Sequence, residues 1–277
     1  MCRSVLRPMN LPARLVTIRC EIQNRSSVSK VMQNNIKPNW QDFYEMCKPR
    51  VVLLMLLCTL AGMFLATDDM VPLATISFCL LGVALVSGSA AALNHLVDAS
   101  VDAKMARTHN RPVAQGRVSN FQGGVFVAIT LALGMAILMV FINSLTAWLN
   151  LAAWAGYGIF YSVYLKRATS QNIVIGGLFG AAPPLFGWTA VTNSIDGGGL
   201  LLVLIIFVWT PPHFWALAID RIEEYKLVEY PMLPVTHGEA YTRLQILLYT
   251  IVLVLITLLP YIIGMSNLLY LAAAVAL

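Results

Sequence analysis

The sequence has few charged residues. Lys, Arg, Asp and Glu together make up 11% of its 277 residues, whereas a water-soluble domain carries about 25%. Hydrophobic residues make up 58%, and the mean hydropathy is +0.74. Apolar runs of about twenty residues recur along the chain, the length that a helix needs to cross the hydrocarbon core of a bilayer. This composition excludes an ordinary soluble domain and predicts an all-α bundle of transmembrane helices.

The sequence also lacks paired cysteines and a secretory signal. Its five cysteines include no C-x-x-C pair and no neighbouring histidine cluster, which argues against a disulfide framework or a zinc site. The N-terminus has no apolar stretch of the kind found in signal peptides. Residues 1–40 are polar and rich in arginine, with Glu21 as the single acid. We predict that residues 1–40 form a disordered tail, with a mitochondrial transit peptide as the alternative, and that residues 41–277 form the membrane domain.

The apolar runs predict where the chain crosses the membrane. They cover roughly 51–67, 72–93, 121–142, 145–164, 172–192, 199–218, 244–263 and 266 onward. The last run ends with the chain after about a dozen residues, so we expect seven complete spans and a truncated eighth. Basic connections alternate with acidic or uncharged ones, and basic residues mark the cytoplasmic side. The N-terminus and the long connections 94–120 and 218–243 are therefore predicted to be cytoplasmic.

A row of acidic and amide side chains ends the second span. Asn94, Asp98 and Asp102 are spaced four apart, which places them along one face of a helix. Mg²⁺ typically binds one or two carboxylates and completes its coordination with substrate phosphate oxygens. Asp220 and Glu224 repeat the four-residue spacing after the sixth span. The row predicts a metal site; the alternative is a solvated helix end that pairs with nearby Lys and Arg residues.

Basic residues follow the acidic row directly. Lys104, Arg107 and Arg111 lie within nine residues of Asp102. Because a guanidinium group binds phosphate oxygens in a bidentate manner, the two arginines form a candidate diphosphate clamp. The alternative is simple positive-inside anchoring.

The sixth span carries an unusual motif of its own. Pro211 and Pro212 are expected to break or kink the helix within the membrane, and kinked helices at membrane depth often line a cavity. His213 follows them, and an ionisable residue inside a membrane is a candidate for function. A histidine beside Trp and Phe residues can equally be a packing residue.

These motifs resemble a known group of enzymes. Asn94-x3-Asp98-x3-Asp102, followed by Met105-x-Arg107-Thr108-x2-Arg111-Pro112, is similar to the aspartate-rich signature of the intramembrane polyprenyltransferase superfamily. Four further stretches resemble one branch, the protoheme IX farnesyltransferases or haem O synthases: Lys48-Pro49-Arg50-Val51, Ala182-Pro183-Pro184-Leu185-x-Gly187-Trp188, Thr210-Pro211-Pro212-His213-Phe214-Trp215, and Pro231-Met232-Leu233-Pro234-Val235-Thr236-His237-Gly238. The resemblance covers residue 40 to the end.

The resemblance implies a nine-span bundle with a central cavity and a Mg²⁺-dependent transfer of farnesyl from farnesyl diphosphate to a vinyl group of haem B. It places the metal and catalytic role on Asn94, Asp98 and Asp102, the second acidic motif on Asp220 and Glu224, and diphosphate contacts on Arg107 and Arg111. Lys104, close to these arginines in the sequence, is a further candidate for the diphosphate. The sequence departs from the family at Glu224, where many relatives have Asp, and in the missing ninth span.

The same resemblance implies the acceptor and the partners. The candidate haem contacts come from the residues themselves: His213 follows the proline pair, and the basic residues at the cytoplasmic mouth could meet the propionates, namely Lys166, Arg221 and Lys226. The implied setting is the bilayer of a bacterial inner membrane, with a mitochondrial inner membrane as the alternative. The product would pass to a haem A synthase or to terminal oxidase assembly, and no nucleic acid is involved.

Three alternative functions remain open from the sequence: prenyl transfer to a quinone-precursor ring, a transporter and an assembly factor. Acids and arginines that gather in two connections on one side favour an enzyme over an ion path.

Overall fold

The computed structural model describes residues 38–276, which consist of helices and the turns between them. The basic tail predicted for residues 1–40 lies, up to residue 37, outside the described residues. In chain order the helices are α2 (Trp40–Met46), α3 (Pro49–Leu65), α4 (Leu73–Asp102), α5 (Asn120–Phe141), α6 (Ser144–Ala155), the π-helix η1 (Gly156–Leu165), α7 (Lys166–Ala168), α8 (Asn172–Gly180), α9 (Pro183–Thr192), α10 (Gly197–Asp220), α11 (Ile222–Leu227), α12 (Leu233–Thr257), α13 (Leu259–Ile262) and α14 (Leu268–Ala276). The prediction of an all-α fold is confirmed.

Every predicted apolar run coincides with helical structure. Five segments are long and apolar enough to cross a membrane: α4, α5, α8 with α9, α10, and α12 with α13. A sixth arises if α2 and α3, which are bent by 52° relative to each other, count as one span. The remaining predicted span is the α6–η1 run, which changes from an α- to a π-helix at Gly156. The number of seven complete spans therefore stays a prediction.

The predicted break at Pro211 and Pro212 is not seen. The helix α10 runs without interruption from Gly197 to Asp220, with both prolines buried inside it. The two prolines remove the helical donors to the carbonyls of Phe207 and Val208. The packing of neighbouring helices makes proline tolerable inside transmembrane helices.

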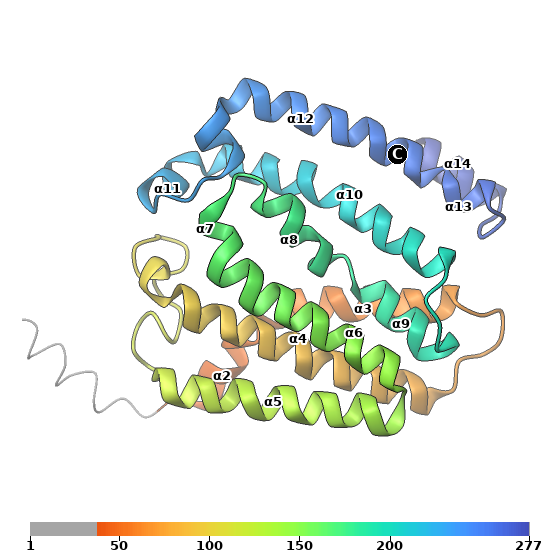
Figure 1. The fold of residues 1–277 in the computed structure, drawn as a ribbon, viewed down its shortest axis with the longest axis horizontal. Coiled ribbons are helices and arrows are strands. Elements are labelled where there is room, and N and C mark those ends of the chain that lie inside the picture. The colour runs from red at the N-terminus through yellow and green to blue at the C-terminus, as the bar shows by residue number, and fades with distance from the viewer. Residues whose placement is uncertain (1–37, 277) are drawn as a thin grey trace, which may run out of the picture. The chain divides into compact units, whose positions relative to one another are not determined.

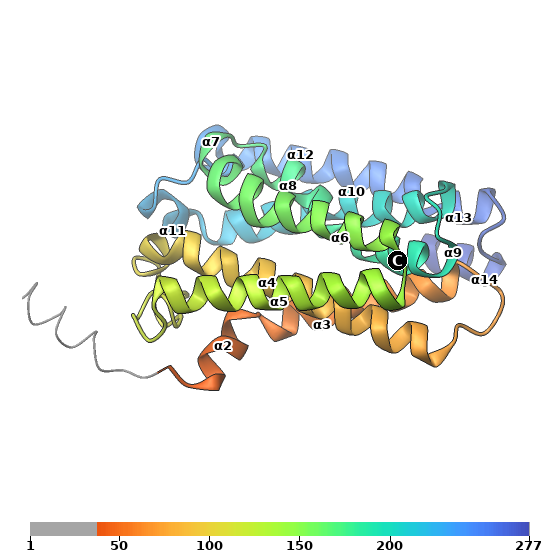
Figure 2. The same cartoon turned by 60° about the horizontal axis from the view of Figure 1, so that its bottom comes forward.

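Small residues allow the helices to approach closely. The helices α4 and α5 run side by side in both views (Figures 1 and 2), and Gly82 on α4 faces Leu138 on α5. Where α3 crosses α9, a Cβ atom on Gly187 would collide with the Thr59 carbonyl, and one on Gly62 with that of Pro184. Small residues at such contacts are typical of helix packing in membranes, where dispersion contacts replace hydrophobic driving force.

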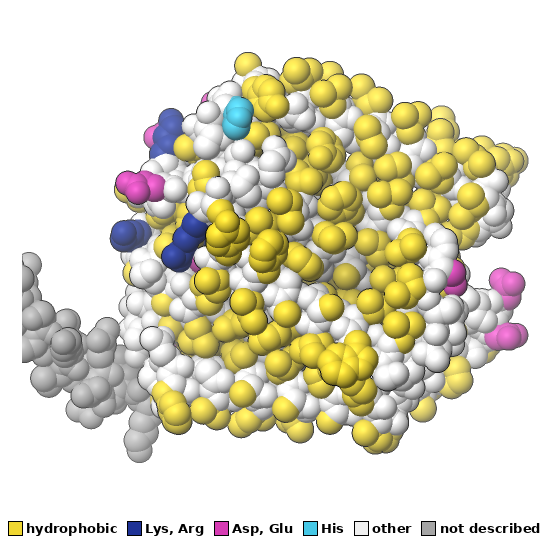
Figure 3. Space-filling model, in the orientation of Figure 1, with side chains coloured by type: hydrophobic (Ala, Val, Ile, Leu, Met, Phe, Trp, Pro, Cys, Tyr) yellow, Lys and Arg dark blue, Asp and Glu magenta, His cyan; other side chains and the backbone are white. Residues whose placement is uncertain are grey.

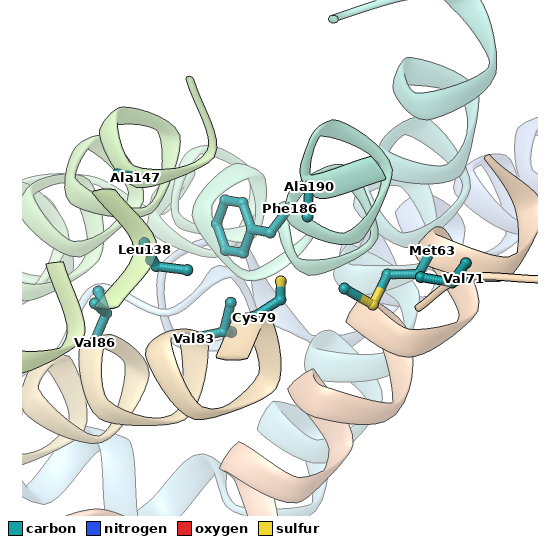
Figure 4. Packing of buried hydrophobic residues seen from close by; sticks show 9 residues of the cluster. All are labelled: Met63, Val71, Cys79, Val83, Val86, Leu138, Ala147, Phe186 and Ala190. Atoms are coloured by element: carbon teal, nitrogen blue, oxygen red, sulfur yellow. The ribbon is translucent and has the colours of Figure 1, made fainter. Parts of the chain in front are cut away.

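A buried apolar cluster joins α3, α4, α5, α6 and α9. It includes Met63, Cys79, Val83, Leu138 and Phe186, which lie close together in Figure 4. A second cluster forms around Trp215 on α10 and the residues at the start of α12. These clusters hold the bundle together on both sides of α4.

The surface is apolar in the middle and charged towards the ends. In Figure 3 hydrophobic side chains cover the centre of the visible face, and Lys, Arg, Asp and Glu lie near its edges. The connection 103–119 and α11 lie at the same end of the bundle (Figure 1). An apolar belt of this kind is what a bilayer core requires of the protein surface around it.

Candidate active site

The site is built around the last three turns of α4. Asn94, Asp98 and Asp102 are buried, with exposed fractions of 4%, 1% and 3%. The helix continues through all three, so they lie along one face as the spacing predicts. Because buried carboxylates are costly unless they are paired, their partners define the chemistry of this end of the bundle.

Three cations surround the row. Lys166 Nζ lies 2.7 Å from Asp98 Oδ2, and Arg111 lies 2.6 Å from Asp102 Oδ2. Lys48 Nζ donates to Asn94 Oδ1 at 2.6 Å. Three basic side chains thus converge on two carboxylates at this end of the bundle. Basic groups gathered in a low-dielectric environment favour an anionic ligand.

The π-helix η1 brings two further partners to α4. The Asn94 amide nitrogen donates to Asp98 Oδ2 at 2.8 Å and to Ser162 Oγ at 3.2 Å. Ser162 in turn donates to the Tyr157 carbonyl five residues earlier. Lys166 follows directly after η1. A π-helix shifts the direction of the side chains that follow it and often occurs at functional sites; here it directs Ser162 and Lys166 towards α4.

Tyr230 reaches the cluster from the connection between α11 and α12. Its hydroxyl donates to Asp98 Oδ1 at 3.3 Å, and Lys166 Nζ lies 4.8 Å from the centre of its ring. Burial, reinforced by the charge of Asp98, raises the pKa of Tyr230 to about 12. The hydroxyl therefore keeps its proton at neutral pH and acts as a hydrogen-bond donor to Asp98.

Two residues with left-handed backbone conformation lie at the site. Lys48 has φ 51°, and Glu229, the residue before Tyr230, has φ 55°. A non-glycine residue in this region is uncommon and strained. Strain of this kind tends to occur at functional positions, where the surrounding contacts compensate for it. Lys48 and Tyr230 are thus held in place by the backbone as well as by their hydrogen bonds.

The other predicted phosphate contacts lie outside the cluster. Lys104 and Arg107 are exposed on the connection 103–119, whereas Arg111 on the same connection is half-buried against Asp102. Their spacing in the sequence did not indicate that only Arg111 would contact the cluster.

The second acidic motif is not assembled with the first. Asp220 is exposed, and Glu224 is half-buried with an Oε2 atom that has no hydrogen-bond partner within residues 38–276. In the same range, no three His, Cys, Asp or Glu side chains are grouped closely enough to hold a metal ion. Mg²⁺ typically takes one or two carboxylates and then substrate phosphate oxygens, so the pair Asp98 and Asp102 fits this ion when phosphate oxygens complete the shell.

The predicted haem contacts are spread apart. His213 is exposed and stacks on Trp209, with ring centres 4.3 Å apart. Lys226 is exposed and paired with Glu223 at 2.8 Å, and Arg221 is half-exposed. Lys166 pairs with Asp98 instead.

The sequence did not predict Lys48, Ser162 and Tyr230 as members of the cluster. Lys48 lies within a motif noted in the sequence, and Tyr230 lies directly before another.

Comparison with known proteins identifies the family. The profile described as "UbiA prenyltransferase family" matches residues 55–277. This chain belongs to the UbiA prenyltransferase family. It is 60% identical, over 89% of its length and 81% of the relative's, to a protein of Saccharophagus degradans named protoheme IX farnesyltransferase. It is 58% identical, over 87% of its length and 81% of the relative's, to protoheme IX farnesyltransferase 1 of Pseudomonas putida strain W619.

Solved structures agree with the family fold. The structure of a digeranylgeranylglyceryl phosphate synthase superposes with a TM-score of 0.72 at 18% identity, over 85% of this chain and 82% of that one. A UbiA homologue from Archaeoglobus fulgidus, bound to DMAPP and Mg²⁺, superposes with a TM-score of 0.71 at 16% identity, over 84% and 82% of the two chains. The resemblance found in the motifs is confirmed: the chain is a multi-pass membrane prenyltransferase of the UbiA family.

Proposed function

We propose that this UbiA-family protein transfers the farnesyl group of farnesyl diphosphate to a vinyl group of protoheme IX (haem B) and so forms haem O. The observation that carries the transfer chemistry is the buried pair Asp98 and Asp102, each held by its own cation at the end of an apolar bundle. The haem acceptor is supported by the names of relatives that are 58–60% identical over more than four fifths of the chain.

The cations of the cluster suit the diphosphate. When a prenyl diphosphate ionises, negative charge grows on the leaving group, and preorganised positive groups directed at that charge usually make the largest catalytic contribution. Lys48, Lys166 and Arg111 are in place for this role, with hydrogen bonds of 2.6–2.7 Å to Asn94, Asp98 and Asp102. Arg107 and Lys104 would contact the diphosphate only as it enters, because they lie exposed on the connection 103–119.

The acidic residues suit Mg²⁺. Asp98, Asp102 and Asn94 offer hard oxygen donors on one face, and Glu224 Oε2 has no hydrogen-bond partner among residues 38–276. The Archaeoglobus fulgidus homologue, which is named as bound to DMAPP and Mg²⁺, supports the same ion. When bound, Mg²⁺ would neutralise the charge of the leaving diphosphate. Asp220, the last residue of α10, would join these donors from the preceding helix.

The haem would bind against α10. His213 and Trp209 form a flat, stacked pair on this helix, and imidazole is a common ligand of haem iron. Arg221 lies between α10 and α11, and Lys226 lies in α11. Both are suited to bind the two propionates. Lys166 is assigned to the diphosphate rather than to haem because it is already engaged by Asp98.

Both substrates are amphiphilic, which fits a site at the membrane surface. The apolar bundle accepts the farnesyl chain and the macrocycle, while the charged end faces water. We place this end and the N-terminus on the cytoplasmic side of a bacterial inner membrane, because the basic connections lie there. The product would pass to a haem A synthase or to terminal oxidase assembly through the same bilayer.

A direct assay tests the acceptor. The full-length protein in lipid nanodiscs would be incubated with haem B, farnesyl diphosphate and Mg²⁺, and the pigment would be extracted and analysed by mass spectrometry. The expected product is a haem that carries one hydroxyethylfarnesyl group. If 4-hydroxybenzoate were prenylated and no haem product formed, the acceptor assignment would be wrong while the diphosphate site would stand.

A further inference from the structure

His95 is a buried side chain that the cluster described above does not use. It follows Asn94 on α4, and its exposed fraction is 2%. Neither of its ring nitrogens has a hydrogen-bond partner within residues 38–276. A buried polar group without a partner costs about 1–3 kcal/mol, and native proteins contain few of them. The imidazole therefore needs a partner that residues 38–276 do not supply.

The position of His95 on α4 directs it towards the acidic row. A helix advances about 100° per residue, so Asp98, Asp102 and His95 point about 40°, 80° and 100° around the axis from Asn94. His95 thus lies within about 20° of the direction of Asp102 and shares its face. All four side chains fall within about one quarter of the helix surface.

The charged groups near His95 indicate whether its ligand would be an anion or a metal ion. Two basic side chains reach this face of α4: Lys48 donates to Asn94, the residue before His95, and Arg111 contacts Asp102. Cations at this position disfavour a metal ion on the imidazole and favour an anion. A neutral imidazole carries one N–H donor, which suits an anionic oxygen.

The depth of His95 in the bundle indicates which part of a prenyl diphosphate it would meet. Seven residues separate it from Asp102, which places it about 10 Å further into the bundle along α4. A prenyl diphosphate enters with its chain towards the apolar interior and its terminal phosphate towards the charged end. At the inner edge of the cluster, a donor meets the phosphate that carries the prenyl ester.

We propose that His95 is a substrate ligand, whose imidazole N–H donates a hydrogen bond to the ester-bearing phosphate of the prenyl diphosphate. This inference rests on the proposed function and extends it to a residue that lies between Asn94 and Asp98 but has no assigned role in the acidic motif. It explains why a polar ring is kept in an otherwise costly position: the missing hydrogen bond forms when the substrate binds.

The experiment uses the full-length protein in nanodiscs with Mg²⁺ and farnesyl thiolodiphosphate, an analogue that does not ionise readily. The protein would carry ¹⁵N-labelled histidine rings, and the chain has four histidines. The His95 signal would be assigned by its loss in His95→Gln. We expect the analogue to shift this signal and to leave that of exposed His109 in place.

Two variants separate binding from folding. In His95→Leu, the apolar side chain removes the unpaired polar group, so the melting temperature without ligand should equal or exceed that of the wild type. Affinity for the analogue should fall about tenfold or more, and the rise in melting temperature on binding should shrink. His95→Gln, which keeps a donor, should retain more affinity, and His109→Gln should match the wild type.

The outcomes are distinguishable. Analogue binding that leaves the His95 signal unmoved, or equal affinity in His95→Leu and the wild type, would overturn the role of His95 while the proposed function stands. A melting temperature that falls in His95→Leu together with unchanged affinity would show a packing residue. Failure of the wild type to bind the analogue would remove the proposed function and the His95 assignment together.

Discussion

The hydroxyl of Tyr230 donates to Asp98 across 132 residues of sequence, at 3.3 Å. This bond connects the segment between α11 and α12 to the acidic row of α4. Because Lys166 contacts both the carboxylate and the ring of Tyr230, the three residues form one unit. The contact joins the two halves of the chain at the charged end of the bundle.

Removing this hydroxyl tests the unit. In Tyr230→Phe the ring still packs among Met232 and Leu233, so the protein should fold. Prenyl transfer should fall about tenfold, since a hydrogen bond to a charged group is lost. Tyr249→Phe is the matched control, because the ring of Tyr249 packs against Trp215 at the same cluster. Equal rates in both variants would contradict a role for the hydroxyl.

The carboxylates should act as a unit. Asp98→Asn and Asp102→Asn should each lower turnover at least about a hundredfold, because each leaves a cation unpaired and weakens the metal site. The double variant should be hardly worse than either single one, since groups that act together are not additive. Turnover measured against Mg²⁺ concentration checks this. Single variants with the rate and Mg²⁺ dependence of the wild type would refute the assignment.

Arg107 and Arg111, both on the connection 103–119, should contribute unequally to diphosphate binding. Arg111→Ala should weaken binding of the diphosphate analogue much more than Arg107→Ala, because Arg111 contacts Asp102 and Arg107 is exposed. The expected losses are about tenfold or more for Arg111 and about threefold or less for Arg107. Calorimetry at fixed salt measures both. The reverse order would mean that the connection rearranges on binding.

The crossing of α3 and α9 should tolerate no added side-chain atom. Gly187→Ala should destabilise the protein by about 1–3 kcal/mol, because the new methyl group meets the Thr59 carbonyl. Gly124→Ala on α5 is the control, since a Cβ atom there meets nothing within 4 Å and alanine favours the helix. Thermal unfolding in detergent compares them. Similar melting temperatures would show that the crossing adjusts.

The ionisation of Asp196, directly before α10, makes the stability of the folded protein depend on pH. Burial opposes its ionisation, but hydrogen bonds from Trp188 and the Gly199 amide outweigh this and lower the pKa of Asp196 below its ordinary value of 3.8. Its contribution to stability is therefore complete above that value and is lost as the pH falls through the lowered pKa. Melting temperatures between pH 7 and about pH 2 should fall less steeply in Asp196→Asn, with the difference confined to the acid end of the series. Parallel curves would exclude this contribution.

The sequence determined the class of the protein and much of its plan. Low charge and apolar runs of membrane length predicted apolar helices whose positions the structure reproduces, and five or six of them are long and apolar enough to cross a membrane. The sequence could predict this because the bilayer imposes length and apolarity on each segment separately. The four-residue spacing of Asn94, Asp98 and Asp102 was enough to place them on one face, since helix periodicity is local. The motifs around them led to the correct family.

Only the tertiary structure decided which residues meet that face. Lys48, Ser162, Lys166 and Tyr230 come from four other segments, and nothing in their local sequence states which helix they will contact. The same limit explains why Arg107 and Arg111 looked equivalent in the sequence but differ in burial. Spacing fixes the direction of a side chain around its own helix, whereas its partner depends on how the helices pack, and packing is set by contacts between residues far apart in the chain.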